Sequence, residues 1–127
     1  MNFFFLFIYF FFILFNNLFS QETECQGAIL RVLNKTTNEK NFFTVPLSRT
    51  IELDNANLVV HRCLKLEKEG KNDEVALLSH KFKKKSDNDF IGWIFNSSQY
   101  INSPRNPVYD IKLEKCLIDD PIFLKNN

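Results

Sequence analysis

Seven short apolar segments, separated by turn residues, constrain the fold of this chain more than any other feature. They lie at Ala28–Leu33, Phe42–Val45, Thr50–Leu53, Leu58–Leu66, Val75–Phe82, Phe90–Asn96 and Val108–Cys116. No segment carries a long apolar pattern with the 3.6-residue period of a helix. Short strands at this spacing predict an all-β fold: a small, single-domain antiparallel β-sandwich or open barrel of about seven strands.

The longest of these segments, Leu58–Leu66, is predicted to be the central strand of the sheet. Because side chains alternate between the two faces of a strand, Val59 and Cys63 are expected on one face. Val60 and Leu64 are expected on the opposite face.

The connections between the segments carry turn chemistry. Asp54–Asn57 is predicted to be a tight turn that joins two hairpin strands. Glu67–Glu74 is polar around Gly70 and is predicted to be a surface loop. The tail Leu117–Asn127 shows no clear period.

The first twenty residues differ from the rest, because they contain no Lys, Arg, Asp or Glu. The apolar run Phe3–Phe15 has thirteen residues. This length matches the core of a signal peptide better than the roughly 20 residues of a spanning helix. Ser20 offers a small residue for cleavage, although Leu18 is large and no basic residue precedes the run. We therefore predict a signal peptide at residues 1–20 or, if it is not removed, an inner-membrane anchor; either places the globular part outside the cytoplasm.

The charge balance argues against one class of partner. Sixteen basic and fifteen acidic residues give a formal net charge of +1. Nucleic-acid binding usually needs a strongly basic face, so we expect no nucleic-acid partner. Contact with a membrane is expected only through the N-terminal segment, if that segment is retained.

The three cysteines lack the spacing of a metal finger or a redox motif. Cys63 and Cys116 lie in two predicted strands far apart in sequence, and in an exported protein they are best interpreted as a structural disulfide. Cys25 is then left over. It is interpreted as a thiol without a role in a flexible N-terminal segment, with lipid attachment, a reactive thiol and an intermolecular bridge as the alternatives.

Several segments together carry a resemblance to a known family. They are Gly27–Leu30, Asn34–Thr37, Val45–Leu47, Leu58–Cys63, Phe90–Ser98 and Asn106–Asp110, with Cys116 following. The pattern resembles the exported alphaproteobacterial envelope proteins of domain of unknown function 2155. This resemblance implies a β-domain at residues 27–116, a periplasmic location and a Cys63–Cys116 pair, and it implies no activity. The C-terminal tail, residues 117–127, lies outside it.

No catalytic or metal-binding constellation is recognisable, and no cofactor is expected. His61 and His80 lack ligands at metal-site spacing and are interpreted as strand-surface residues. Ser97 or Ser98 with His61 and Asp110 has the residue types of a hydrolase triad, but no nucleophile-elbow signature accompanies them.

The aromatic residues near the glycine-tryptophan strand are interpreted as structural. Trp93 is expected in the core, although an exposed Trp could stack on a sugar or a peptide. Tyr109 is expected in the core with its hydroxyl bonded to a loop carbonyl. Gly92 is expected to permit close packing or a bulge. The basic stretch Lys81–Lys85 is interpreted as a solvated hairpin tip, with contact to anionic lipid or cell-wall polymer as the alternative.

These observations favour a non-enzymatic periplasmic domain that binds or assembles with another envelope component. The partner is expected to be an envelope protein or a cell-wall or lipid component. The loop Asn96–Asn106 is the predicted contact surface, with Tyr100, Ile101 and Arg105 as candidate binding residues. The alternative is a small periplasmic enzyme, either a hydrolase at the Ser97 group or a thiol enzyme at Cys25.

Overall fold

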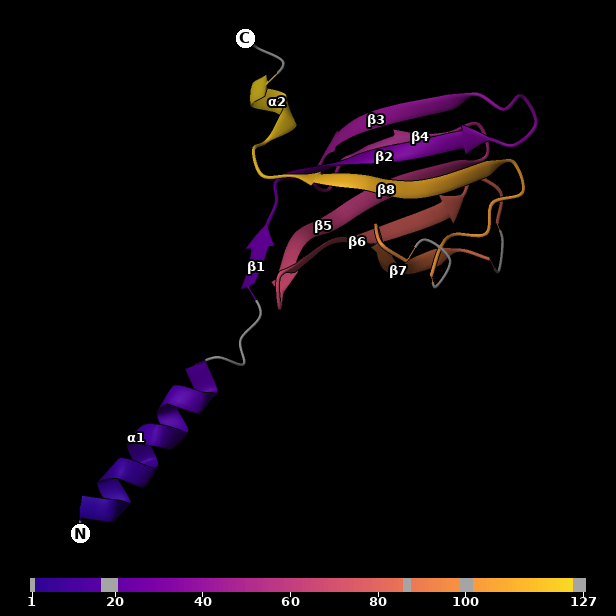
Figure 1. The fold of residues 1–127 in the computed structure, drawn as a ribbon. Coiled ribbons are helices and arrows are strands. Elements are labelled where there is room, and N and C mark those ends of the chain that lie inside the picture. The colour runs from indigo at the N-terminus through magenta and orange to yellow at the C-terminus, as the bar shows by residue number, and fades with distance from the viewer. Residues whose placement is uncertain (1, 17–20, 86–87, 99–101, 125–127) are drawn as a thin grey trace.

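The computed structural model describes residues 2–16, 21–85, 88–98 and 102–124 (Figure 1). Its elements are α1 (Asn2–Asn16), β1 (Gln21–Glu24), β2 (Gly27–Asn34), β3 (Lys40–Pro46), β4 (Thr50–Glu52), β5 (Ala56–Lys68), β6 (Lys71–Phe82), β7 (Phe90–Phe95), β8 (Tyr109–Leu117) and α2 (Pro121–Leu124). All seven predicted strands are present, so the prediction of an all-β fold is confirmed.

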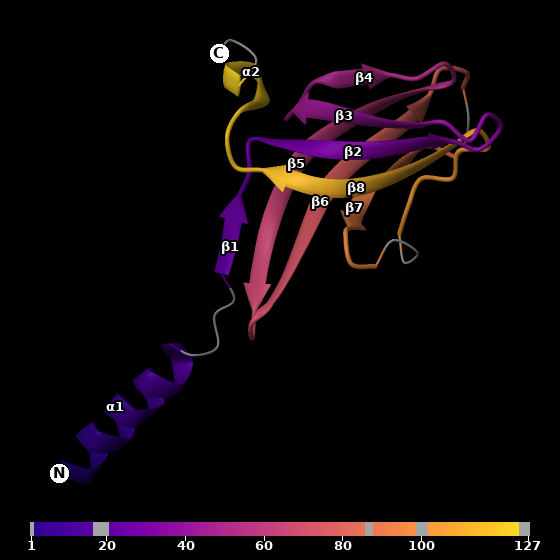
Figure 2. The same cartoon turned by 45° about the horizontal axis from the view of Figure 1, so that its top comes forward.

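The strands form two antiparallel sheets (Figures 1 and 2). One sheet has the order β1-β5-β6-β7, and β4 pairs with β5 as well. The other has the order β3-β2-β8. Neither sheet closes on itself in the described part of the chain, so the fold is an open sandwich rather than a barrel.

Strand β1 is the strand that the apolar pattern does not reveal. Gln21–Glu24 pairs with the second half of β5, and Gln21 lies opposite Glu67. All four of its residues are exposed. Its stability therefore comes from backbone hydrogen bonds to β5 and from an ion pair between Glu24 and Arg62 rather than from apolar burial. As a result the N-terminal segment leaves the domain beside the β5–β6 hairpin.

The predicted surface loop between β5 and β6 is in fact a two-residue hairpin turn. Lys68 pairs with Lys71, and the residues between them, Glu69 and Gly70, have positive φ angles of 52° and 75°. Two consecutive left-handed residues are what a tight hairpin turn requires, and Gly supplies one without steric cost. The predicted tight turn between β4 and β5 is confirmed, since the backbone N–H of Leu53 donates to the carbonyl of Ala56.

A β-bulge at His61 changes which residues of β5 reach the core. The pairing register with β6 shifts between Val60 and Arg62. In consequence Val60 and Cys63 are both buried, at 0% and 1% exposed, and His61 points to solvent. The predicted alternation, which placed Val60 and Cys63 on opposite faces, is wrong because a bulge adds a residue to one strand.

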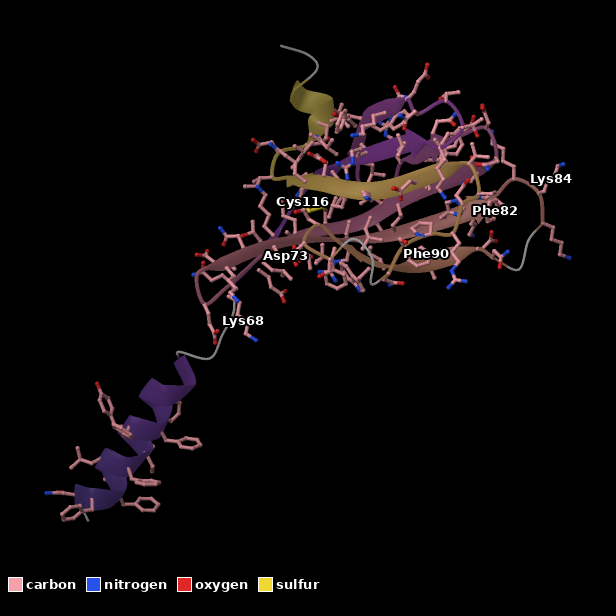
Figure 3. The ribbon with its side chains drawn as sticks, turned by 45° about the vertical axis from the view of Figure 1, so that its right-hand side comes forward. Lys68, Asp73, Phe82, Lys84, Phe90 and Cys116 are labelled. Carbon is pink, nitrogen blue, oxygen red and sulfur yellow. A yellow bond between two sulfur atoms is a disulfide. The ribbon has the colours of Figure 1, made fainter. Side chains whose placement is uncertain are left out.

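The disulfide between Cys63 and Cys116 connects the two sheets (Figure 3). Cys63 lies in β5 of the larger sheet and Cys116 in β8 of the smaller one, with 5.7 Å between their Cα atoms. The two cysteines belong to a buried cluster from both sheets that also includes Leu30, Leu78 and Ile111. The predicted pairing is confirmed, and it fixes the spacing of the sandwich near the end where β1 enters.

Gly27 lets the C-terminal tail pack against the sandwich. A Cβ atom at this position would lie 2.6 Å from the Cγ atom of Pro121 and 2.7 Å from the carbonyl oxygen of Val45. Pro121 is buried and opens α2, whose Ile122 N–H donates to the Asp120 side chain. The first part of the tail is therefore an ordered part of the domain.

Helix α1 extends away from the sheets (Figure 1). Its side chains from Phe3 to Phe12 are exposed. Among the described residues, no helix combines the length and the hydropathy of a membrane span.

Candidate functional site

A groove of about 710 Å³ lies at the end of the sandwich opposite the entry of β1. It is called the distal groove here, and it is lined by Lys35, Phe82, Asn88, Ser103, Pro104, Arg105, Asn106, Pro107, Tyr109 and Asp110. In Figure 3, Phe82 and Lys84 lie at one end of the sandwich, and Lys68, in the β5–β6 hairpin, lies at the other.

The floor of the distal groove is organised by the side chain of Asn106, which is 2% exposed. Its Oδ1 atom accepts from the backbone N–H groups of Val108 and Tyr109, at 2.9 and 3.0 Å. Its amide also forms two reciprocal 3.0 Å hydrogen bonds with the amide of Asn55. A single buried side chain thus connects the β4–β5 turn to the start of β8.

His80 completes this network from below. The Nδ2 atom of Asn106 lies 3.0 Å from Nε2 of His80. Because Oδ1 of Asn106 accepts from two backbone N–H groups, its NH2 group is assigned as the donor to Nε2, and the buried Nδ1 has no hydrogen-bond partner in the described structure. His80 is fully buried, and its ring meets that of Phe82 edge to face at 4.7 Å. Burial lowers the pKa of His80. The interpretation of His80 as a surface residue is therefore wrong, whereas His61 is exposed as predicted.

The rim of the distal groove carries both charge signs and an aromatic hydroxyl. Lys35 donates from Nζ to the carbonyl of Asn106 at 2.9 Å. The hydroxyl of Tyr109 donates to the Asp54 carboxylate at 3.2 Å. Desolvation, with the hydrogen bond to Asp54, raises the pKa of Tyr109. Tyr109 packs against the core as predicted, but its acceptor is a carboxylate and not a carbonyl.

One of the three predicted binding residues, Arg105, lines the distal groove and is exposed. Tyr100 and Ile101 lie outside the described residues. The described ends of their loop are held to the sheets. Asn96 donates from Nδ2 to two carbonyls of β8, at 2.9 and 2.8 Å, and Asn102 donates to the carbonyl of Trp93 at 3.1 Å.

In strand β7, Gly92 has the predicted role and Trp93 does not. A Cβ atom on Gly92 would lie 2.9 Å from Nδ2 of Asn102, so glycine permits the predicted close packing. Trp93 is only half-buried. The next residue, Ile94, points into the core, so Trp93 faces outward, where the guanidinium of Arg62 lies 5.8 Å from its ring centroid. The expectation of a core Trp93 is wrong.

The residues of the hypothetical hydrolase triad are each bound elsewhere. The Ser97 hydroxyl donates to the Asp73 carboxylate at 2.6 Å. His61 pairs with the Ser79 hydroxyl at 3.0 Å, and Asp110 forms an ion pair with Lys112 at 3.5 Å. In the described ranges no group of three or more potential metal ligands comes together.

Cys25 is buried, at 2% exposed, and not part of a flexible segment. Its backbone N–H donates to the carbonyl of Cys63 at 2.8 Å, which continues the pairing of β1 with β5. Burial raises the pKa of its thiol, so the reactive thiolate is disfavoured. The expectation of a flexible thiol is therefore wrong.

A second hollow, of about 360 Å³, lies where β1 meets the β5–β6 hairpin. Three of its charged groups have partners. Glu74 forms an ion pair with Lys65 at 3.6 Å and accepts from the backbone N–H of Cys116. Asp73 accepts from Ser97. These contacts fasten β6 to its neighbours, so this hollow is less suited to a ligand than the distal groove.

Sequence reasoning missed the residues that build the floor of the distal groove. In the sequence, His80 lies 26 positions before Asn106, and Asn55 lies 51 positions before it. One local signal pointed to them: Asn106 precedes a proline, and Asn-Pro favours turn initiation.

The fold and the groove define a class: a small, disulfide-linked open β-sandwich with a polar-floored groove at one end. The family model described as an uncharacterized protein conserved in bacteria, domain of unknown function 2155, matches residues 28–116. The chain belongs to this family. No match was found among curated proteins or among solved structures.

Proposed function

We propose that this protein is an exported, non-enzymatic domain of the alphaproteobacterial cell envelope that binds an extended segment of another envelope protein in its distal groove. The observation that carries the proposal is the placement of a wide groove with a hydrogen-bonded floor at the end of the sandwich farthest from the N-terminal segment.

The features near the N-terminus support export. An uncharged apolar segment precedes the domain, and a disulfide joins its two sheets. Disulfides persist in oxidising compartments such as the periplasm. Because Gln21 pairs beside the β5–β6 hairpin, a retained N-terminal anchor would hold that end near the membrane. The distal groove would then face away from the inner membrane.

The chemistry of the rim supports a peptide ligand. Prolines and Tyr109 offer apolar surface, and the cations Lys35 and Arg105 lie beside the Asp110 carboxylate, which is paired with Lys112. Mixed charges beside apolar and aromatic surface suit a peptide better than a uniformly anionic polymer. The fixed floor also lowers the cost of ordering the binding site, since Asn106 already holds the β4–β5 turn to the start of β8.

The test is crosslinking and affinity capture of the tagged protein from its own envelope. Arg105→Glu reverses one charge on the rim, and Lys71→Glu makes the same reversal at the opposite end as the matched control. We expect one dominant protein partner that the Arg105 variant loses and the Lys71 variant keeps. Equal recovery with both variants would contradict the assignment of the groove. Mass spectrometry of the digested capture sample also identifies the mature N-terminus, and so distinguishes a cleaved signal peptide from an anchor.

A further inference from the structure

A separate groove of about 400 Å³ crosses the outer face of the larger sheet. It is called the sheet-face groove here, and its lining residues come from four adjacent strands: Thr50, Asn57, Val59, His61, Ser79, Lys81 and Ile91. None of the described residues lines both this groove and the distal groove.

The polar side chains of the sheet-face groove offer hydrogen-bond donors and acceptors of several kinds. His61 and Ser79 are held together at 3.0 Å, and Ser79 is only 7% exposed, so this pair is fixed in place. Asn57 brings an amide whose Oδ1 atom is buried without a hydrogen-bond partner in the described structure. An unsatisfied acceptor of this kind gains free energy from any donor that reaches it.

Apolar surface lies directly beside these polar groups. Ile91 is 70% exposed, and Val59 is half-buried. Trp93 follows Ile91 on the same face of β7, because alternate residues of a strand share a face. The register places Ile91 opposite Ser79 and Trp93 opposite Leu77, so Trp93 lies next to the lining residues, beyond Ile91, rather than among them.

We propose that the sheet-face groove binds a saccharide chain. Sugar hydroxyls both donate and accept hydrogen bonds, while the C–H faces of the rings pack on aliphatic and aromatic side chains. Both features lie side by side in this groove. Among the described lining residues, Lys81 is the one Lys or Arg side chain. The nearby Arg62 is already paired with Glu24. The charge of the groove therefore suits a neutral or weakly anionic glycan better than a polyanion.

The chain provides its own reporter for this site, since Trp93 is the only Trp. The test follows Trp93 fluorescence and calorimetric heats while the full chain is titrated with chitotetraose or cellotetraose. Sedimentation with isolated peptidoglycan sacculi distinguishes a cell-wall polymer from a free oligosaccharide as the source of the glycan. We expect binding of at least one of these three probes, with a change in Trp93 emission for the soluble ones.

Two variants test the assignment independently. Asn57→Leu removes the unsatisfied amide, and Lys81→Met removes the ammonium; each is expected to weaken binding about fivefold or more. Lys71→Met is the matched control at the hairpin tip and should bind like the unchanged protein. Thermal unfolding checks that each variant is folded.

Three results would overturn the proposal: no binding of any probe at millimolar concentration, unchanged binding in both groove variants, or an equal loss in the Lys71→Met control. This inference does not depend on the distal groove. Arg105→Glu is expected to leave saccharide binding intact, so the failure of one proposal is distinguishable from the failure of the other.

Discussion

Asn106 is the residue on which the geometry of the distal groove depends. It satisfies two backbone N–H groups, the amide of Asn55 and the imidazole of His80 from one buried position. Each group left unpaired in a buried site costs free energy, so the contribution of this side chain exceeds that of a single hydrogen bond. The β4–β5 turn, β6 and the start of β8 are held together in this way.

Replacing Asn106 should therefore be strongly destabilising. We expect Asn106→Leu to lower the free energy of unfolding by about 3 kcal/mol, because several buried polar groups lose their partner at once. Asn41→Ala, at an exposed position in β3, should change stability by less than about 0.5 kcal/mol. Urea unfolding of both variants checks this prediction, and equal values would contradict it.

The buried neutral His80 should make stability depend on acidity. Burial lowers the pKa of His80 in the folded state. Between the folded and the unfolded pKa values, His80 is therefore protonated in the unfolded chain and neutral in the folded chain. The His80 contribution is complete above the unfolded pKa of about 6.5 and is lost progressively as the pH falls toward the folded pKa.

The expected steepest slope is about 1.4 kcal/mol per pH unit, the value for one proton. His80→Gln should flatten the stability profile just below pH 6.5. Denaturant unfolding across this pH range makes the comparison. A profile that is as steep in His80→Gln as in the unchanged protein would refute the assignment.

At the level of elements, the predicted strands were found where apolar alternation and turn residues coincide. Strand β1 escaped prediction because Gln21–Glu24 has no apolar residue and is held by pairing with β5. The bulge at His61 was equally invisible, since pairing between distant strands determines it. Arg105 was predicted from its loop and lines the distal groove, and its binding role stays a prediction. The network beneath it joins residues too far apart in sequence for any local pattern to connect.

The contact between β2 and the start of α2 provides a test of the element packing. Gly27→Ala would place a Cβ atom within 2.8 Å of three atoms of Pro121 and Val45. We expect a loss of about 1–3 kcal/mol from this overpacking. Gly70→Asn is the control, since Asn tolerates the positive φ of the hairpin turn. Comparable losses in the two variants, measured by thermal unfolding, would argue against the close packing of α2.

On the scale of the whole molecule, the disulfide fixes one sheet against the other. Cys63 and Cys116 are 53 positions apart. In the chain-entropy model, a bond that closes a loop of this length lowers the entropy of the unfolded chain and so stabilises the folded protein by about 4 kcal/mol. The free energy of unfolding of the double variant Cys63→Ala, Cys116→Ala should therefore be lower by about 4 kcal/mol. A loss below about 1 kcal/mol would show that the sandwich holds its sheets together without the bond.

Alkylation gives a complementary prediction for the third cysteine. Cys25 is buried beside Cys63 and its thiol pKa is raised, so it should resist iodoacetamide in the native protein and react after unfolding. Mass spectrometry of the two digests compares these states. Rapid labelling of the native protein would mean that β1 detaches from β5 easily.

The two ends of the sandwich have different expected roles, and lysines mark both. Lys35 lines the distal groove, Lys84 lies at the same end, and Lys68 and Lys71 flank the turn beside the N-terminal segment. The most direct measurement is lysine-specific crosslinking of the native envelope, with each linked peptide identified by mass spectrometry. The account predicts partner peptides joined to Lys35 or Lys84. A partner joined only to Lys68 or Lys71 would contradict it and move the interface to the opposite end of the molecule.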